Sequence, residues 1–492
     1  MLYRDVATQR CYEETIKTLL DFKEAEMRLD EEFKKSGYFW LPSNPEKRIP
    51  GTLFIKDGGN IELEVVGLFD DSIDGINRAI NGSDALTRVV GHIEKYGLVT
   101  LDDCFYKNRN ISFGGISKST VHVNRAFLGV AYEENEIILF NHLQFSVEGI
   151  DEWVGSSGIK VEHQFENKSA SITFNPPEEV TLNLNNGMKL QLTFTWTLPG
   201  FPSQKEAKIT QKTYFKLSSV QERSLDDFIS TAYKITTLLG FAIDKTVCIE
   251  KVTATSETIR RDIGNEKTAL VPISIYYPSL PFSKNRPKIE RHRMLFRFEQ
   301  IENDAERIIN NWFDAYDEID PTLNLYFSTK TGAHKYLEGR FLALAQGLET
   351  YHRRTSKMKL MDEDAFKKLV SALIEQCPDE NKEWLSGRLR HGNEVSLSRR
   401  IKSIIEPFKE LFGTNEEREK LIRAIVDTRN YLTHYDQSLE AVVVKGKELW
   451  MLCLKMEAIF QLHLLQILGF NQSEVKTVFE KSHELQQKLK EV

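Results

Sequence analysis

The sequence predicts an α+β protein of several domains, in which an antiparallel β-rich region, sandwich- or barrel-like, precedes an all-α helical bundle. Three observations lead to this fold class. The chain has 492 residues, several times the length of an ordinary domain. Apolar residues alternate with polar ones in much of the first 220 residues. From about residue 331 they recur instead every three or four residues, which is the helical period.

We divide the chain into four regions on this basis. Residues 1–40 are expected to form a charged helix, from Thr15 to Lys35, and a loop that leads into the strands. Residues 41–220 form the β-rich domain, residues 221–330 form a connecting region, and residues 331–492 form the bundle. The connecting region is assigned neither to the β-rich domain nor to the bundle.

Two predicted hairpins make the β-rich domain antiparallel. The strands Thr52–Ile55 and Ile61–Val66 flank Asp57-Gly58-Gly59-Asn60, and glycine accepts the positive φ angles that a tight hairpin turn requires. Alternating apolar residues on both sides of Asn185-Asn186-Gly187 predict a second hairpin with one buried face. Further strands are predicted at Val99–Phe105, Thr120–Tyr132, Ile137–Val147 and Ser169–Phe174.

The connecting region mixes both periods. Leu225–Phe241 and Asn303–Ile319 are predicted to be helical, whereas Val247–Thr255 and Val271–Tyr277 are predicted to be strands.

The bundle is predicted from apolar stripes at helical spacing. Three stripes lie within Leu337–Tyr351, Phe366–Ile374 and Ile401–Phe412. Thr414-Asn415-Glu416-Glu417 is a capping box, which predicts the start of a fourth helix. Leu449–Phe470 is apolar nearly all round and is expected to be the central helix.

The composition excludes several classes of protein. The opening residues carry charges throughout, so no secretory signal is expected. The five cysteines are scattered and form no C-x-x-C pair, which suits a reducing compartment and argues against a zinc site. Leu449–Phe470 contains Lys455 and Glu457, whose charges argue against a membrane span. We therefore expect a cytoplasmic protein without membrane contact, cofactor or metal.

Charge is distributed unevenly along the chain. The net charge is −7, from 65 basic and 72 acidic side chains. Residues 331–492 hold 26 basic and 24 acidic side chains, which leaves 39 basic and 48 acidic side chains in residues 1–330. Any chemistry on nucleic acid is therefore expected in the C-terminal third, at a local site.

The common nucleotide-binding, metalloprotease and esterase motifs are absent. The strongest candidate for such a site is the segment Arg429-Asn430-Tyr431-Leu432-Thr433-His434. Arg429 continues the apolar stripe of its helix, and a guanidinium there needs a partner or a cleft. Asn430 and His434 are four residues apart and share one face at the end of the helix.

A structural interpretation of the same residues is preferred while they are considered alone. Arg429 would form an ion pair with an acid such as Glu349, and His434 would cap the last carbonyl groups of the helix. The spacing is not decisive, because Arg286 and His292 match it equally well in a segment beside Pro287 that resembles a loop.

A resemblance to a known family adds context. Three stretches and part of the front half resemble the ApeA-type HEPN family of bacterial anti-phage proteins, and the similarity covers most of residues 45–450. The segment that ends at His434 is similar to the R-x(4–6)-H motif of HEPN domains. The stretches are Arg340–Arg354, Ser396–Ile401 and Arg429–His434, and the parts of the front half are Gly51–Gly67 and Val99–Cys104.

The resemblance implies an endoribonuclease that needs no metal. His434 would act as base or acid, because an imidazole titrates near neutral pH. Arg429 would stabilise the pentavalent phosphorane with its planar, permanently charged guanidinium. Asn430 would orient His434 or hold a phosphate oxygen. Two HEPN bundles usually pair so that both motifs share one cleft, so the resemblance also implies a homodimer through the bundle.

Basic residues near these motifs are candidates for RNA binding: Arg353, Arg354, Arg399 and Arg400. A solvated helix end is the simpler interpretation of both pairs, since runs of charge usually face water. Glu349 could support Arg429, although an ordinary surface glutamate is again the simpler interpretation.

We therefore predict an endoribonuclease of anti-phage defence that acts by abortive infection. Its acidic N-terminal region would sense a phage protein or restrain the bundle. Two alternatives remain. The bundle could be a non-catalytic scaffold that binds RNA, nucleotides or protein. The β-rich region could instead carry the function, by binding a glycan or a protein, while the helices only dimerise.

Overall fold

The computed structural model describes residues 27–29, 32–70, 85–110, 112, 115–200, 205–435 and 437–490. Most of the helix predicted over Thr15–Lys35 lies outside these residues. The predicted end of that helix is wrong, because Phe33 begins the first strand of the protein.

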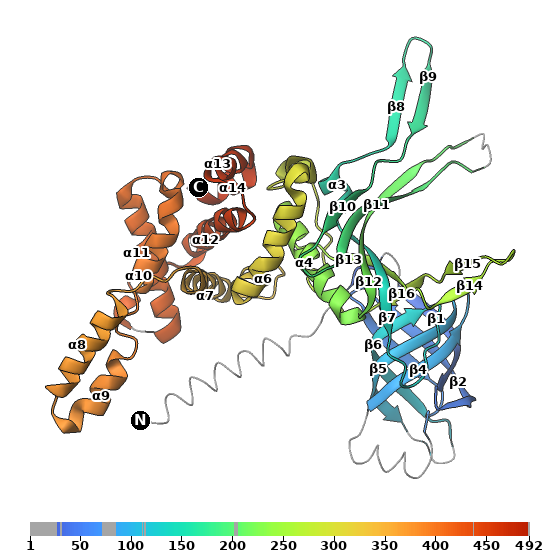
Figure 1. The fold of residues 1–492 in the computed structure, drawn as a ribbon, viewed down its shortest axis with the longest axis horizontal. Helices are drawn as coiled ribbons and strands as arrows, with labels where there is room; N and C mark the ends of the chain where they lie inside the picture. The colour runs from blue at the N-terminus through green and yellow to red at the C-terminus, as the bar shows by residue number, and fades with distance from the viewer. Residues whose placement is uncertain are drawn as a thin grey trace. The chain divides into compact units, whose positions relative to one another are not determined.

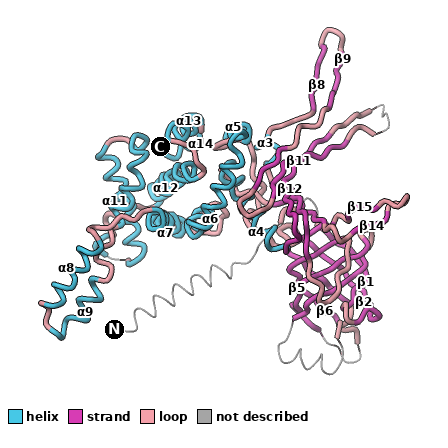
Figure 2. The backbone as a smooth tube through the Cα atoms, in the orientation of Figure 1, coloured by secondary structure: helices cyan, strands magenta, loops and turns pink. Residues whose placement is uncertain are grey.

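The chain forms two compact units, and the fold class predicted from the sequence is confirmed. The first unit comprises the residues up to 291 together with 297–302, and the second comprises 292–296 together with the residues from 303 onward. The connecting region is therefore divided between the two units. The first unit is rich in antiparallel strands, and the second is helical (Figures 1 and 2).

Six strands of the first unit close into a ring. The sequence predicted a sandwich-like or a barrel-like arrangement, and the ring is barrel-like. Neighbours are antiparallel, and β5 pairs with both β4 and β6 to complete the circle. The predicted turn joins β2 to β3, with Gly58 at φ 104° and Gly59 at φ 71°. Leu53, Ile61 and Leu101 are fully buried in the core that this ring encloses. The strands are β1 (Phe33–Leu41), β2 (Asn44–Lys56), β3 (Asn60–Val65), β4 (Ala85–Ile93), β5 (Gly97–Asn110) and β6 (Lys118–Leu128).

Six further strands extend the same sheet beyond β6, in the order β16, β13, β7, β12, β11 and β10. The second predicted hairpin is confirmed, because Leu182 pairs with Leu190 and Gly187 has a φ of 82° in the turn. Helix α4 (Leu225–Ile243) contacts β7 and β12. The strands are β7 (Leu139–Val147), β10 (Val180–Asn183), β11 (Lys189–Thr197), β12 (Thr210–Ser224), β13 (Ile249–Thr255) and β16 (Ile273–Tyr276).

The first unit also contains short elements outside this sheet. Two separate hairpins, β8–β9 and β14–β15, form two-stranded sheets of their own. Two short helices, α3 and α5, contact each other. The bounds are α3 (Ile150–Val154), β8 (Ile159–Gln164), β9 (Ser169–Phe174), β14 (Arg260–Asp262), β15 (Thr268–Leu270) and α5 (Phe298–Ile301).

The second unit is built around α12 (Gly446–Ile467), which contacts most of the other helices of the bundle. The prediction of a central helix is confirmed, since Cys453, Met456 and Leu462 are completely buried. Within the described ranges, no helix has the length and apolar character that crossing a membrane requires. The other helices are α6 (Ala305–Ser328), α7 (Leu337–Thr355), α8 (Glu363–Glu375), α9 (Asp379–Leu389), α10 (Leu397–Ile405), α11 (Asn415–His434), α13 (Gln472–Lys481) and α14 (His483–Leu489).

Helices α8 and α9 form an arm that adds nothing to the buried core. No residue of either helix is buried, and Leu369 and Leu373 are each 44% exposed. The helix of the second apolar stripe is therefore present, as the sequence predicts, but none of its residues joins the buried core. The arm is closed at its base, where the Asn393 side chain donates to the Met361 carbonyl at 3.0 Å and accepts from the Met361 N–H at 2.9 Å.

Candidate functional site

Helix α11 places the predicted Arg–Asn–His segment at its C-terminal end. The predicted capping box is present at its start, where the Thr414 hydroxyl and the Glu417 carboxylate each accept a backbone N–H of the other residue. Ile422, Ile425 and Thr428 are buried and fix which face of α11 points into the bundle. The segment that carries Arg429 follows directly, in the last turns of this anchored helix.

Arg429 is held between two neighbours. Its Nη2 donates to Glu349 Oε2 of α7 at 3.3 Å, and its Nη1 donates to Asn430 Oδ1 at 3.3 Å. Its side chain is 32% exposed, so the guanidinium is partly accessible to a ligand. The ion pair expected under the structural interpretation is therefore present, and it leaves part of the cation open.

His434 ends the helix, and its side chain is exposed. The chain turns away directly after it, because Tyr435 adopts the left-handed conformation with a φ of 50°. Among the described residues, none forms a hydrogen bond or ion pair with the His434 imidazole. Asn430 lies one helical turn before His434. The structure therefore places Arg429, Asn430 and His434 at the same end of α11, where Arg429 contacts Asn430.

Glu349 joins Arg429 to a second arginine. Its Oε1 accepts from Arg353 Nη2 at 3.0 Å and Nε at 3.2 Å, while its Oε2 faces Arg429. The Glu349 side chain is only 19% exposed. Glu349 therefore lies between two cations and contacts Arg429 directly.

Arg353 continues the contacts to Glu394, which lies between the arm and α10. Arg353 Nη1 donates to Glu394 Oε2, and Arg400 Nη2 donates to the same oxygen at 3.1 Å. His391 Nδ1 lies 3.3 Å from Glu394 Oε1. Burial acts to raise the pKa of Glu394, but the hydrogen bonds from Arg353 and His391 and the charges of Arg353 and Arg400 together outweigh this, so the pKa is lowered.

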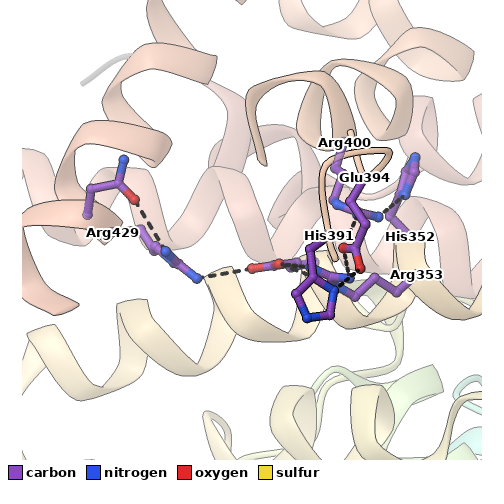
Figure 3. Close-up of polar contacts among 8 residues, drawn as sticks. His352, Arg353, His391, Glu394, Arg400 and Arg429 are labelled. Carbon is purple, nitrogen blue, oxygen red and sulfur yellow. Dashed lines mark hydrogen bonds and ion pairs between the residues drawn. The ribbon is translucent and has the colours of Figure 1, made fainter. Parts of the chain in front are cut away.

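Arg400 ends this series of contacts in the interior. It is 4% exposed, and its Nη1 donates to His352 Nδ1 at 3.2 Å. The second ring nitrogen of His352, Nε2, is buried and has no partner among the described residues. Burial, together with the charges of Arg400 and Arg353, lowers the pKa of His352, which favours the neutral form of the imidazole. Figure 3 shows the polar contacts as one continuous series from Arg429 to His352.

The four arginines predicted to bind RNA therefore differ in their surroundings. Arg399 and Arg354 are exposed, and Arg354 donates to the Glu318 carbonyl at 2.9 Å. Arg353 is 46% exposed and engaged by two carboxylates. Arg400 is the one that the structure buries, so its guanidinium is not offered to a ligand in solvent.

Two features of this region were missed by sequence reasoning. Glu394 belongs to no sequence motif that would indicate its contacts with Arg353, Arg400 and His391. It lies two residues before a stretch that supported the family resemblance. His352 appears only as part of another such stretch. In the part of the chain that the structure describes, no three His, Cys, Asp or Glu side chains gather where they could hold a metal ion.

Comparison with known families agrees with this architecture. The family model "ApeA N-terminal domain 1" matches residues 34–312, and the family model "Apea-like HEPN" matches residues 342–474. The first match spans more than half of the chain, so the protein belongs to the ApeA-type HEPN family. The second match includes the whole series of contacts from Arg429 to His352. Searches among curated proteins and among solved structures found no match.

Proposed function

We propose that this protein is a metal-independent endoribonuclease of anti-phage defence, which cleaves RNA through attack by the RNA's own 2′-OH. The observation that carries the proposal is the end of α11, where a partly exposed Arg429 touches Asn430 and an exposed His434 follows one turn later. HEPN domains are typically ribonucleases, and the HEPN match of this chain contains the same segment.

The proposed reaction requires two proton transfers and the stabilisation of one extra negative charge. The 2′-oxygen attacks the adjacent phosphorus while its proton passes to a base, and the 5′-oxygen leaves with a proton from an acid. His434 serves as one of these two groups, because an imidazole takes up and releases protons near neutral pH. Arg429 stabilises the extra negative charge of the phosphorane. The products are a 2′,3′-cyclic phosphate and a 5′-OH end.

Asn430 and Glu349 are proposed to orient the cation. Arg429 contacts both, so its guanidinium is restricted in direction before RNA arrives. A phosphate group then competes with Glu349 for the same guanidinium. Preorganised charge of this kind lowers the barrier more than a mobile side chain would.

Arg353, Arg354 and Arg399 are proposed to contribute to RNA binding at the ends of α7 and α10. Their exposure supports this assignment. Arg400 belonged to the same set of predicted RNA-binding residues, but its burial supports a role inside the protein.

The remaining parts of the proposal concern context. We propose that two copies pair through the bundle, that the protein acts in the cytoplasm, and that the N-terminal region senses a phage protein or restrains the nuclease. The excess of acidic residues in residues 1–330 supports a regulatory partner other than RNA for that region.

The direct experiment is RNA cleavage by the full-length protein in EDTA, with wild type beside Arg429→Ala and His434→Ala. Cleavage by the wild type that both substitutions abolish would support the proposal. Cleavage that survives both substitutions would contradict it.

A non-catalytic scaffold is the second candidate, because Arg429 already has an acidic partner in Glu349. In that case the protein would bind RNA, nucleotides or protein without cutting. Arg429→Ala and His434→Ala would then leave protection against phage unchanged in cells.

A further inference from the structure

Polar contacts around the candidate site converge on Glu394, a residue to which no role has been given so far. Its Oε2 accepts from Arg353 and, at 3.1 Å, from Arg400, while its Oε1 lies 3.3 Å from His391. The side chain is 26% exposed, so it is screened from water more than the exposed ion pairs of the bundle are. Three donors therefore fix the direction of this carboxylate.

Two shared residues link Glu394 to Arg429. Arg353 donates to both Glu394 and Glu349, and Glu349 divides its two oxygens between Arg353 and Arg429. The four charges thus alternate in sign along the series. Since each inner group serves two neighbours, loss of one contact changes how the next group divides its hydrogen bonds.

Glu394 is also held firmly by its own surroundings. Asn393 is buried and closes the base of the arm through Met361, and Lys359 pairs with Glu394 in an isolated β-bridge. On the other side, the buried Arg400 is fixed by His352. Glu394 is therefore a fixed point, whereas Arg353 and Arg429 are long side chains at the surface end of the series.

We propose that Glu394 is a positioning residue for Arg429, acting through Arg353 and Glu349. By engaging Arg353, Glu394 keeps this arginine from drawing the Glu349 carboxylate away from Arg429. Its effect on catalysis rests on the ribonuclease function proposed above, whereas its effect on the Arg429 side chain does not.

The first test is kinetic and uses the full-length protein. Glu394→Gln keeps the shape of the side chain but removes the charge, so Arg353 should take a larger share of Glu349. We expect kcat to fall about tenfold or more with KM nearly unchanged, because a misplaced catalytic group affects the reaction rather than substrate binding. Glu419→Gln is the matched control. Glu419 lies on the same helix as Arg429, and its carboxylate accepts from Lys402 of α10 at 2.7 Å.

A double substitution separates positioning from general damage. In Glu394→Gln/Arg353→Met, the competitor for Glu349 is gone, so part of the lost kcat should return. A purely structural role of Glu394 predicts a further loss instead, because a second ion pair is broken. Wild-type kcat in Glu394→Gln, or no recovery in the double variant, would overturn the inference.

The second test needs no activity. The Nε–H resonance of Arg429, assigned from its loss in Arg429→Lys, should shift in NMR spectra of Glu394→Gln but not in those of Glu419→Gln. An unmoved resonance would overturn the inference even in a protein that cuts RNA. A shifted resonance in a protein that cuts no RNA would support positioning while the proposed function fails.

Discussion

The guanidinium of Arg429 lies 3.3 Å from the carboxylate of Glu349, although the two residues are 80 positions apart in the chain. The contact joins α11 to α7 and partly neutralises the cation that we propose to act on phosphate. It also fixes the direction of that cation. Glu349 therefore both orients Arg429 and competes with phosphate for it. Its removal is expected to strengthen RNA binding and to slow RNA cleavage.

Replacing Glu349 by Gln should separate these two effects. Loss of the negative charge should tighten binding of an RNA that cannot be cut by up to about fivefold, which corresponds to a partly exposed ion pair. Cleavage should become about tenfold slower, because Arg429 loses its orientation. The measurements are the Kd for a 2′-deoxy-substituted RNA and kcat for the normal RNA. Tighter binding with unchanged or faster cleavage would show that Glu349 only restrains the site.

Arg399 and Arg400 are adjacent, and the structure predicts that they behave differently. Arg399→Ala should weaken RNA binding and leave the midpoint of urea unfolding unchanged, because Arg399 is exposed. Arg400→Ala should lower the stability by about 3 kcal/mol, because it leaves Glu394 and the buried His352 without their shared partner. Equal losses of stability in the two variants would contradict the burial of Arg400.

His463 predicts a dependence of stability on pH. Its Nε2 donates to the Ile404 carbonyl at 2.8 Å, its Nδ1 faces the Tyr351 hydroxyl at 3.2 Å, and burial lowers its pKa to about 4. The unfolded chain, with an ordinary pKa of about 6.5, binds the proton more readily. The stabilising contribution is therefore complete above pH ~6.5 and is lost as the pH falls towards 4.

At pH 5 this loss should amount to roughly 2 kcal/mol of unfolding free energy. His463→Gln can form both hydrogen bonds without titrating, so its stability should fall less steeply between pH 6.5 and 4. His483→Gln, at an exposed position, is the control and should behave as the wild type. Identical slopes for wild type and His463→Gln would contradict the prediction.

Leucines of the arm and of the bundle should respond differently to truncation. Leu344 is completely buried on α7, and Leu344→Ala should lower the stability by about 2–5 kcal/mol. Leu369→Ala should change the stability by less than about 0.5 kcal/mol, because this side chain is 44% exposed on α8. The midpoint of thermal unfolding compares the two. A large loss in Leu369→Ala would mean that another surface covers the arm.

Local signals in the sequence predicted much of the fold. The hairpin at Gly58-Gly59 and the capping box at Thr414 depend on neighbouring residues, and both are present in the structure. The stripe that contains Leu369 has the same period as the buried stripes. Periodicity identifies a helix with an apolar face, but whether another helix covers that face depends on the tertiary fold, so the sequence could not predict its exposure.

The candidate site was predictable only in part for a similar reason. Arg429, Asn430 and His434 are close in sequence, and a helix brings them together by its own geometry. Glu394 reaches the site through Arg353 and Glu349, across separate elements, and no spacing in the sequence shows this. The burial of Arg400 beside an exposed Arg399 depends on the angular position of each residue around α10, which packing against α7 determines.

The most direct test of attack by the 2′-OH uses one RNA with a single 2′-deoxy nucleotide at a mapped cleavage position, incubated with the wild-type protein in EDTA beside the unmodified RNA. The proposed mechanism predicts 2′,3′-cyclic phosphate and 5′-OH ends from the unmodified RNA and no cleavage at the substituted position. Cleavage at the deoxy position with equal efficiency would contradict attack by the 2′-OH, and with it the roles proposed for Arg429 and His434.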